Sequence, residues 1–329
     1  FRLLVELFVS DETYRQTMVG CQAFTMIAQL LSQIHLVHLG GKVVDSVRAV
    51  SDALPIESVP WADFQLHLIW HFPLWVYTPE TFQAKLLELL IHWTSDELGA
   101  SRFRKLIGVQ RILDMIRLCY WDEANLGMRM RMPDERKLPS SVLSIYLAAS
   151  GRAPRTSGRV NTRPTRPVLA AMRHRLLRIV ENIVGSSPSF LEARSLVSFA
   201  MECPDPIPVF EVVEVIVRLY TSPATSAQIA SHVENLGGVQ LCLAGFDRER
   251  PVVDAAFMRL LSIILTTAQP KKAKTIDIEA LALAATSQIE SRPQTEATID
   301  VMIQLLCMQV PDATGATYFD YEAIASGKM

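Results

Sequence analysis

Residues 103–121 read FRKLIGVQRILDMIRLCYW, and they decide the fold class because their apolar residues recur at the spacing of an α-helix with one buried face. The predicted buried face consists of Val109, Ile112, Leu113, Ile116 and Tyr120. The opposite face is polar, and there Asp114 and Arg117 stand at the i, i+3 spacing of an ion pair within one helix. The segment therefore predicts an amphipathic helix that packs against neighbours.

Gly108 opens this helix, and the same arrangement of an apolar residue, one or two glycines and an apolar helix occurs twice more. The other copies are LGGKVV at 39–44 and LGGVQLCL at 236–243. Glycine adopts the left-handed backbone conformation without steric cost, so one helix can end there and the next can leave at a sharp angle. A phrase that recurs at wide spacing is typical of stacked helical repeats. We therefore predict an all-α fold: an irregular armadillo/HEAT-like α-solenoid, a right-handed superhelix of stacked helices.

The composition argues against several classes of protein. Hydrophobic residues make up 50% of the 329 residues and only 14 residues are glycine, which favours a folded chain rich in helix. The formal net charge of −2 provides no general attraction to nucleic acid. The five cysteines lie far apart without a C-x-x-C pair, as in proteins of a reducing compartment. We therefore expect a cytoplasmic protein that binds neither nucleic acid nor a small-molecule substrate.

Two apolar stretches near the N-terminus need an interpretation. The run 1–9 begins with Phe1 and lacks the basic flank and cleavage site of a signal peptide, so we expect a segment of a larger chain. Residues 16–41 contain no Asp, Glu, Lys or Arg, but their polar side chains form one stripe along the predicted helix. We therefore expect a helix wedged between neighbours rather than a membrane span.

One segment interrupts the helical pattern. Residues 148–167 read AASGRAPRTSGRVNTRPTRP, with three prolines, two glycines, five arginines and no apolar face that a helix could bury. We expect a flexible insertion there, which divides the solenoid into an N-terminal part, residues 1–147, and a C-terminal part, residues 168–310. The final residues, 311–329, are expected to form a tail.

The phrase at 103–121 resembles a pattern, FRKKYGVQ-LLD-hR-YYW, in the helical region upstream of the BEACH domain of neurobeachin-type BEACH/WD-repeat proteins. The resemblance extends in order and spacing over roughly residues 60–265. It implies an armadillo-like α-solenoid within a very large, cytosolic, membrane-associated scaffold of vesicle traffic or autophagy. The PH-like, BEACH and WD-repeat modules of that family lie further toward the C-terminus. The resemblance supplies no catalytic residues.

The best candidate for a metal site is Asp63, His67 and His71, because i, i+4 spacing would place all three on one helical face. His92 is a further candidate ligand. Large apolar residues surround the set, and histidines of a packed amphipathic helix explain it more simply. The chain also lacks the motifs of nucleophilic catalysis and of phosphate binding. We therefore predict no enzyme, no metal site and no cofactor, and keep a metal-dependent all-α enzyme as an alternative.

The strongest electrostatic signal is local. Residues 129–178 contain twelve basic side chains and only two acidic ones. Five of the basic residues lie in the insertion: Arg152, Arg155, Arg159, Arg163 and Arg166. Such a cluster is either a solvated loop or a contact for a protein partner or an anionic membrane surface, to which each basic residue contributes about 1 kcal/mol. The insertion has no aromatic residues on which nucleic-acid bases could stack.

A cluster of aromatic residues gives a second candidate site. Its members are Trp61, Trp70, Trp75 and Tyr77. The plainer interpretation is a hydrophobic core, and the alternative is a groove in which a peptide or helix docks.

The function predicted from these observations is that of a non-catalytic scaffold, a protein-interaction segment of a large BEACH-type protein in vesicle trafficking or autophagy. Its partners would be other proteins and other domains of the parent chain. Two alternatives stay open. One is a membrane-recruitment module that uses the basic residues 129–178, peripheral to membranes. The other is a generic armadillo/HEAT adaptor unrelated to BEACH proteins.

Overall fold

The computed structural model describes residue 6, residues 12–33, 39–122 and 164–245, and scattered positions between 253 and 264. Within these ranges every regular element is helical, so the predicted all-α class is confirmed. The chain forms two compact units, Phe1–Val215 and Ile216–Met329. Their boundary falls inside α13 (Pro206–Thr221).

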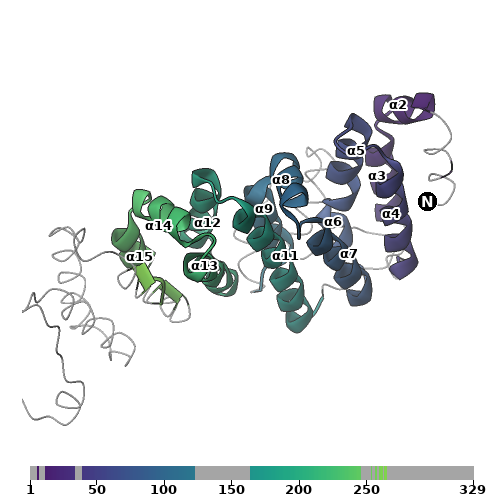
Figure 1. Cartoon of the computed structure of the whole chain (residues 1–329). Helices are drawn as coiled ribbons and strands as arrows, with labels where there is room; N and C mark the ends of the chain where they lie inside the picture. The colour runs from purple at the N-terminus through teal and green to yellow at the C-terminus, as the bar shows by residue number, and fades with distance from the viewer. Residues whose placement is uncertain are drawn as a thin grey trace, which may run out of the picture. The chain divides into compact units, whose positions relative to one another are not determined.

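The first unit is a succession of helices that pack in layers. In chain order they are α2 (Glu12–Gly20), α3 (Ala23–Gln33), α4 (Gly41–Ala53), α5 (Val59–Phe64), the π-helix η2 (Gln65–Ile69), α6 (Phe72–Trp75), α7 (Glu80–Trp93), α8 (Glu97–Leu106), α9 (Gly108–Cys119), α11 (Arg166–Ser186), α12 (Phe190–Glu202) and the start of α13. Helix α4 packs on α7, α7 packs on α11, and α9 packs on α12 (Figure 1). Each layer thus covers an apolar face of the previous one, which is the construction of an α-solenoid.

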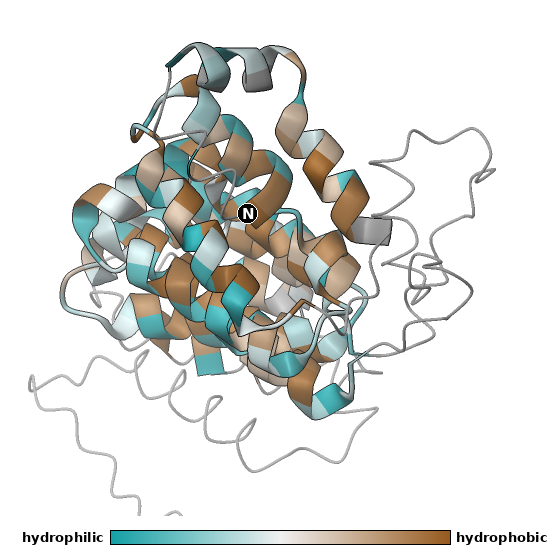
Figure 2. Cartoon of the chain, turned by 90° about the vertical axis from the view of Figure 1, so that its right-hand side faces the viewer, coloured by the Kyte–Doolittle hydropathy of each residue, from teal (hydrophilic) through white to brown (hydrophobic). Residues whose placement is uncertain are grey.

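The helices are amphipathic, as Figure 2 shows by the hydrophobic and hydrophilic stripes along them. Helix α9 follows the prediction closely: Val109, Ile112, Leu113 and Ile116 are buried on one side. On the other side, an Arg117 Nη2 lies 3.1 Å from Asp114 Oδ1, which confirms the predicted ion pair. Helical periodicity predicts the buried face of α9 correctly because a helix that packs on one side leaves its other side in water.

The glycines of the three repeated phrases do not all act in the same way. Gly108 has φ = +72°, and Gly237 and Gly238 have φ = +113° and +48°, so these two phrases do turn the chain through the left-handed region. Gly40 caps α4 with an extended backbone, at φ = −95°. The prediction is therefore confirmed for the second and third phrases, and for the first the glycine is not required by backbone conformation.

Helix α11 is the longest in the described part of the first unit, with 21 residues. It contacts α7, α8 and α9, and Met172, Leu176 and Ile183 on its buried face are fully inaccessible. Because α11 begins at Arg166, the last two residues of the predicted insertion are helical, and residues 148–163 lie outside the described residues. The segments on either side of the insertion belong to one compact unit.

Arg104 holds α8 against α11 and α12. Its Nε donates to Glu192 Oε1 at 2.6 Å, and its Nη2 donates to Ser186 Oγ at 3.0 Å and to the carbonyl of Ile183. Glu192 also completes a capping box with Ser189 at the start of α12. A single side chain therefore joins the ends of three helices.

Arg173 is the most completely buried charged side chain among the described residues of the first unit. Its side chain has 0% exposure, and Nε and Nη2 donate to the two carboxylate oxygens of Glu211 on α13 at 2.7 and 2.9 Å. Its Nη1 donates to the carbonyl oxygen of Tyr120 at 2.9 Å, and Asp122 Oδ1 lies 3.8 Å from Nη2. Removing a guanidinium from water costs several kcal/mol, which this bidentate pairing offsets.

The second unit contains the end of α13, α14 (Ser226–Asn235) and α15 (Gly238–Gly245), and α14 packs on α15. Thr225 fixes the turn before α14, because its buried Oγ1 donates to the carbonyl of Leu219 at 2.6 Å. Ile229, Val233 and Cys242 form part of the core. The unit is again made of short helices that bury one face.

The described helices include none that is long and apolar enough to cross a membrane. The uncharged stretch 16–41 contains α3, an amphipathic helix of 11 residues, and its residues 34–38 lie outside the described residues.

Replacing Arg173 by methionine should lower the free energy of unfolding by about 3–5 kcal/mol, because the buried carbonyl oxygen of Tyr120 and the carboxylate of Glu211, which is only 22% exposed, would both lose their donors. Urea denaturation followed by circular dichroism measures the change. The control is Arg48→Met on α4, since Arg48 and its partner Asp52 are both exposed, at 58% and 61%, and lie 3.6 Å apart. That control should cost less than about 1 kcal/mol. Equal losses in the two variants would contradict the stabilising role of Arg173.

Gly108→Ala should lower the free energy of unfolding by about 1–2 kcal/mol, because an L-residue is strained at φ = +72°. No atom lies within 4 Å of the added Cβ, so the effect reports backbone strain and not a clash. Gly185→Ala in α11 is the control. There the backbone is helical and the space is also open, so alanine should raise stability by about 0.4–1 kcal/mol. The same urea titration distinguishes the two signs.

Candidate binding pocket

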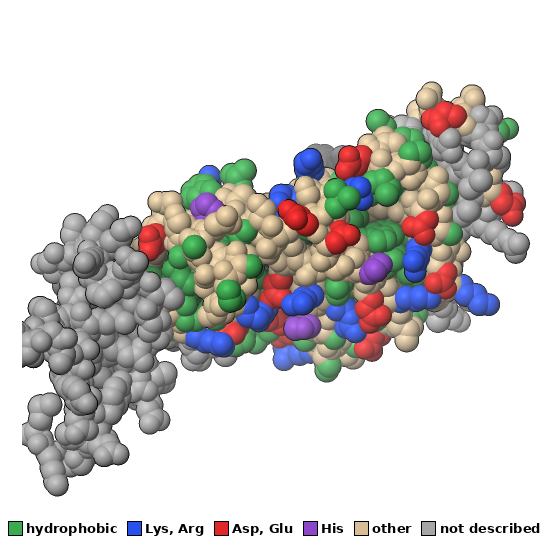
Figure 3. Space-filling model, in the orientation of Figure 1, with side chains coloured by type: hydrophobic (Ala, Val, Ile, Leu, Met, Phe, Trp, Pro, Cys, Tyr) green, Lys and Arg blue, Asp and Glu red, His purple; other side chains and the backbone are tan. Residues whose placement is uncertain are grey.

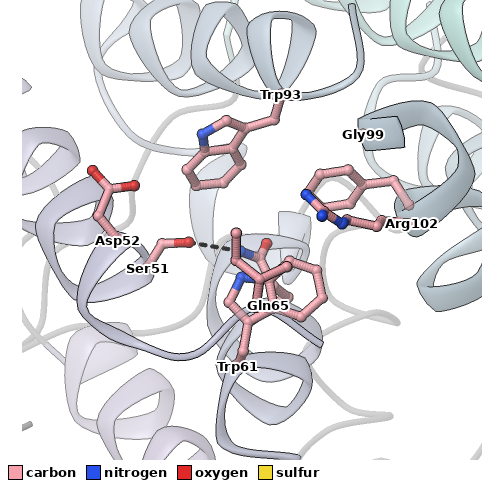
Figure 4. A pocket seen from close by; sticks show the side chains of 9 residues that line it. Ser51, Asp52, Trp61, Gln65, Trp93, Gly99 and Arg102 are labelled. Carbon is pink, nitrogen blue, oxygen red and sulfur yellow. Dashed lines mark hydrogen bonds between the residues drawn. The ribbon is translucent and has the colours of Figure 1, made fainter. Parts of the chain in front are cut away.

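A pocket of about 200 Å³ lies between α4, α5, η2 and the facing ends of α7 and α8 (Figure 4). It is lined by Ser51, Asp52, Ile56, Trp61, Gln65, Trp93, Gly99, Arg102 and Phe103. Its floor is buried, whereas Ile56 on the rim is 58% exposed. The pocket is therefore open to solvent and has an inner wall that water reaches poorly.

Local sequence signals set the helices that form its walls. Ser58 caps α5, where its Oγ accepts from the backbone N–H of Trp61 at 3.3 Å, and Asp96 caps α8, where its Oδ1 accepts from the N–H of Gly99 at 2.6 Å. Only glycine fits at position 99, because a Cβ there would lie 2.0 Å from the carbonyl oxygen of Trp93. This close approach brings the end of α7 against the start of α8.

Three aromatic rings form the apolar part of the pocket. Trp93 and Phe103 are stacked, with ring centroids 6.1 Å apart and an interplanar angle of 7°. Trp61 packs on Phe103 from another direction, with centroids 5.8 Å apart. Aromatic pairs at such distances contribute beyond their buried area. The three rings thus form a rigid surface on which a further planar group could pack.

Gln65 is the polar group of the floor, and it is fully buried. Its Nε2 donates to Ser51 Oγ at 3.0 Å, while its Oε1 has no hydrogen-bond partner among the described residues. Gln65 also begins the π-helix, and its carbonyl accepts from the N–H of Trp70 at 2.9 Å. Single π-turns occur frequently at functional sites, and a buried acceptor without a donor costs about 1–3 kcal/mol.

The rim carries charges of both signs. Arg102 Nε lies 3.1 Å from Glu57 Oε1, and Asp52 lies 3.6 Å from Arg48. Glu57 adopts a left-handed backbone conformation at φ = +64°, which turns the chain beside the exposed Ile56. These exposed pairs contribute little to stability, and the charges of the rim stay accessible to a ligand.

Comparison with protein families gives the identity of the region. A family model described as "Neurobeachin/BDCP, DUF4704 alpha solenoid region" matches residues 1–323. The chain belongs to this family. The match covers nearly the whole chain and confirms the resemblance seen in the phrase at 103–121. Comparison with curated proteins and with solved structures finds no significant match.

The four predicted aromatic residues of this neurobeachin-type solenoid do not act together. All four are buried, with Trp61 6% exposed and Tyr77 7%, but only Trp61 is among the residues that line the pocket. Trp75 belongs to the core, since its Nε1 donates to the carbonyl oxygens of Leu68 and Ile69 at 2.9 and 3.1 Å. The structure thus places Trp61 alone of this set at the pocket wall.

Gln65, Trp93, Arg102 and Phe103 were not among the predicted site residues. No motif joins them, because they come from three elements that only the packing of the solenoid brings together. Glycine at position 99 is the one local signal, since a glycine near the start of a helix marks a close approach of backbones.

The three candidate metal ligands do not all lie on one helical face. The π-helix ends at Ile69, and His71 lies beyond it with a non-helical backbone at φ = −87° and ψ = 65°. The i, i+4 spacing from His67 to His71 therefore does not place these two side chains on one helical face. Asp63 Oδ1 instead contacts His67 Nε2 at 3.2 Å. Among the described residues no group of three or more His, Cys, Asp or Glu side chains, and hence none that includes His92, could hold a metal ion.

The described basic residues of the span 129–178 do not form the exposed basic surface that the sequence suggests. Arg152, Arg155, Arg159 and Arg163 lie outside the described residues, and Arg166 is 72% exposed with Nε 3.9 Å from Asp122 Oδ2. Three further members of the span lie on α11: Arg173 is buried, and Arg175 and Arg178 contact Glu88 and Glu181. Counting Arg173 with an exposed basic surface was therefore wrong, because its charge is neutralised inside the core.

His71 should make stability depend on pH. Burial, with smaller contributions from the charges of Arg111 and His67, lowers the pKa of His71 from 6.5 to about 4. Between these values the folded state binds fewer protons than the unfolded state. Stability is therefore fully present above pH 6.5 and is lost as the pH falls toward 4, by up to about 3 kcal/mol.

Urea titrations at several pH values between 7 and 4.5 measure this loss. Because glutamine carries no titrating group, His71→Gln should flatten the decline relative to the unsubstituted chain. His67→Gln, at the more exposed neighbouring histidine, is the control. A decline of the same slope with and without His71 would contradict the assignment.

Proposed function

We propose that this neurobeachin-type solenoid is a non-catalytic scaffold segment that binds other proteins, within a large BEACH-type parent that acts in vesicle traffic or autophagy in the cytoplasm. The observation that carries the proposal is the family match over residues 1–323. A solenoid of this kind is a structural fold, and its stacked helices offer an extended surface for partners.

The surface of the described residues supports protein partners. On the face shown in Figure 3, acidic and basic side chains are intermixed with apolar ones and form no large patch of a single sign. Large apolar side chains also reach the surface, among them Ile56, Leu98 and Leu191 at 58%, 59% and 71% exposure. Protein interfaces combine apolar and polar surface in this way, whereas nucleic-acid interfaces are strongly basic.

Membrane recruitment is the second candidate function. It rests on the five arginines of residues 148–167, of which Arg166 is described and exposed. Family membership removes the remaining alternative, an adaptor unrelated to neurobeachin-type proteins.

One experiment separates the two candidates. The chain and a variant with Arg152, Arg155, Arg159, Arg163 and Arg166 all changed to serine are tested side by side. Each is immobilised for capture of cytosolic proteins, which mass spectrometry quantifies, and each is sedimented with phosphatidylcholine vesicles with and without phosphatidylserine. We expect both chains to retain the same proteins, including components of vesicle traffic, and neither to bind the anionic vesicles strongly.

A variant of equal charge serves as the control, with serine at five exposed basic positions elsewhere: Lys42, Arg48, Lys105, Arg117 and Arg194. Vesicle binding that only the first variant loses, at roughly 1 kcal/mol per arginine, would establish membrane recruitment instead. A folded chain that retains no cytosolic protein above empty resin would overturn the scaffold role.

A further inference from the structure

We propose that the pocket between α4, α5, η2, α7 and α8 receives one tryptophan side chain of a partner protein. The inference rests on the proposed interaction role of the solenoid, and it names the chemistry by which one partner is anchored. Tryptophan is enriched among the few residues that dominate binding at protein interfaces.

The size of the pocket favours a side chain over a free small molecule. Sites for small-molecule ligands and cofactors usually measure about 300–1,000 Å³. The pocket measures about 200 Å³, too small for such a ligand but sufficient for one large side chain. Its open rim, where Ile56 and Asp52 are exposed, leaves room for the backbone that carries the side chain.

The walls favour an aromatic group. Trp61, Trp93 and Phe103 present ring surfaces to the cavity, and the stacked pair Trp93–Phe103 is held in place by the close approach at Gly99. Arg102 faces the same cavity, and Figure 4 shows its guanidinium opposite Trp61 and Trp93. A guanidinium is attracted to the face of an indole more strongly than to other rings.

The polar floor selects tryptophan among the aromatic residues. The atom of the floor without a partner among the described residues is Gln65 Oε1, whereas Nε2 donates one of its two N–H groups to Ser51 Oγ, and the amide lies at the centre of the labelled side chains in Figure 4. The indole N–H is a donor only, so it can satisfy this acceptor and leaves nothing of its own unpaired. A tyrosine hydroxyl also brings an acceptor that needs a donor of its own, and its single ring covers less of the aromatic walls than an indole does. Phenylalanine would leave Gln65 Oε1 without a donor.

The proposal is tested with the whole chain and small probes, independently of any partner. The probes are N-acetyltryptophan amide, its 1-methylindole analogue and N-acetyltyrosine amide, titrated while the ¹H–¹⁵N signals of the Gln65 amide and the Trp93 indole are followed. We expect saturable shifts of both signals. The 1-methyl analogue should bind roughly five- to tenfold more weakly, because it cannot donate the hydrogen bond.

Two variants identify the pocket. Gln65→Leu should bind the tryptophan probe and its 1-methyl analogue equally, because the acceptor is gone. Ile56→Ser, at a rim position that is 58% exposed, should weaken the binding of both probes several-fold. Leu191→Ala, an exposed apolar position on α12, should leave binding unchanged. If Gln65→Leu does not fold, the pocket assignment is still tested by comparing the binding of the two indole probes to the unsubstituted chain and to Ile56→Ser.

The outcomes separate this inference from the scaffold role. No saturable shift at Gln65, equal affinity for the two indole probes, or tighter binding of the tyrosine probe would overturn the pocket assignment, while capture of cytosolic proteins would still support the scaffold. Probe binding with the expected preference, but without capture of any protein, would retain the pocket chemistry and overturn the scaffold role.

Discussion

The buried guanidinium of Arg173 is the constraint on which the first compact unit depends. With 0% exposure it is the most completely buried charged side chain among the described residues, and its donors hold the end of α9, helix α11 and helix α13 at once. A charge in that place is tolerated only if Glu211 and the carbonyl of Tyr120 arrive with good geometry. We therefore expect α9, α11 and α13 to pack together in one step. This packing joins α9, which precedes the Arg-rich stretch, to α11 and α13, which follow it.

Asp205 makes this core more sensitive to charge. Burial raises the pKa of its carboxyl group, although hydrogen bonds from the N–H groups of Asp122 and Ile207 and the charge of Arg173 oppose the shift. An acid with a raised pKa in the folded state favours folding at low pH, and that contribution decreases as the pH rises through the window between the two pKa values. The buried guanidinium of Arg173 thus lies among three carboxyl groups, those of Asp122, Asp205 and Glu211.

The pocket results from two departures from regular helix packing. The π-helix that begins at the fully buried Gln65 interrupts the α-helical register, and beyond it His71 has a non-helical backbone. The lack of a side chain at Gly99 lets α7 and α8 approach so closely that Trp93 stacks on Phe103. Neither feature follows from periodicity. For this reason the sequence predicted Trp61 as a site residue but grouped it with Trp70, Trp75 and Tyr77, which pack in the core.

The sequence by itself determined the all-α class, the family, the buried face of α9 and the turns at Gly108 and Gly237, because these depend on local periodicity and on backbone conformations that only glycine adopts freely. Only the tertiary structure decided that Arg173 lies in the core and not on a basic surface, and which residues form the pocket. Burial, charge pairing and the completion of hydrogen bonds depend on contacts between residues far apart in the chain, and helical spacing carries no information about them.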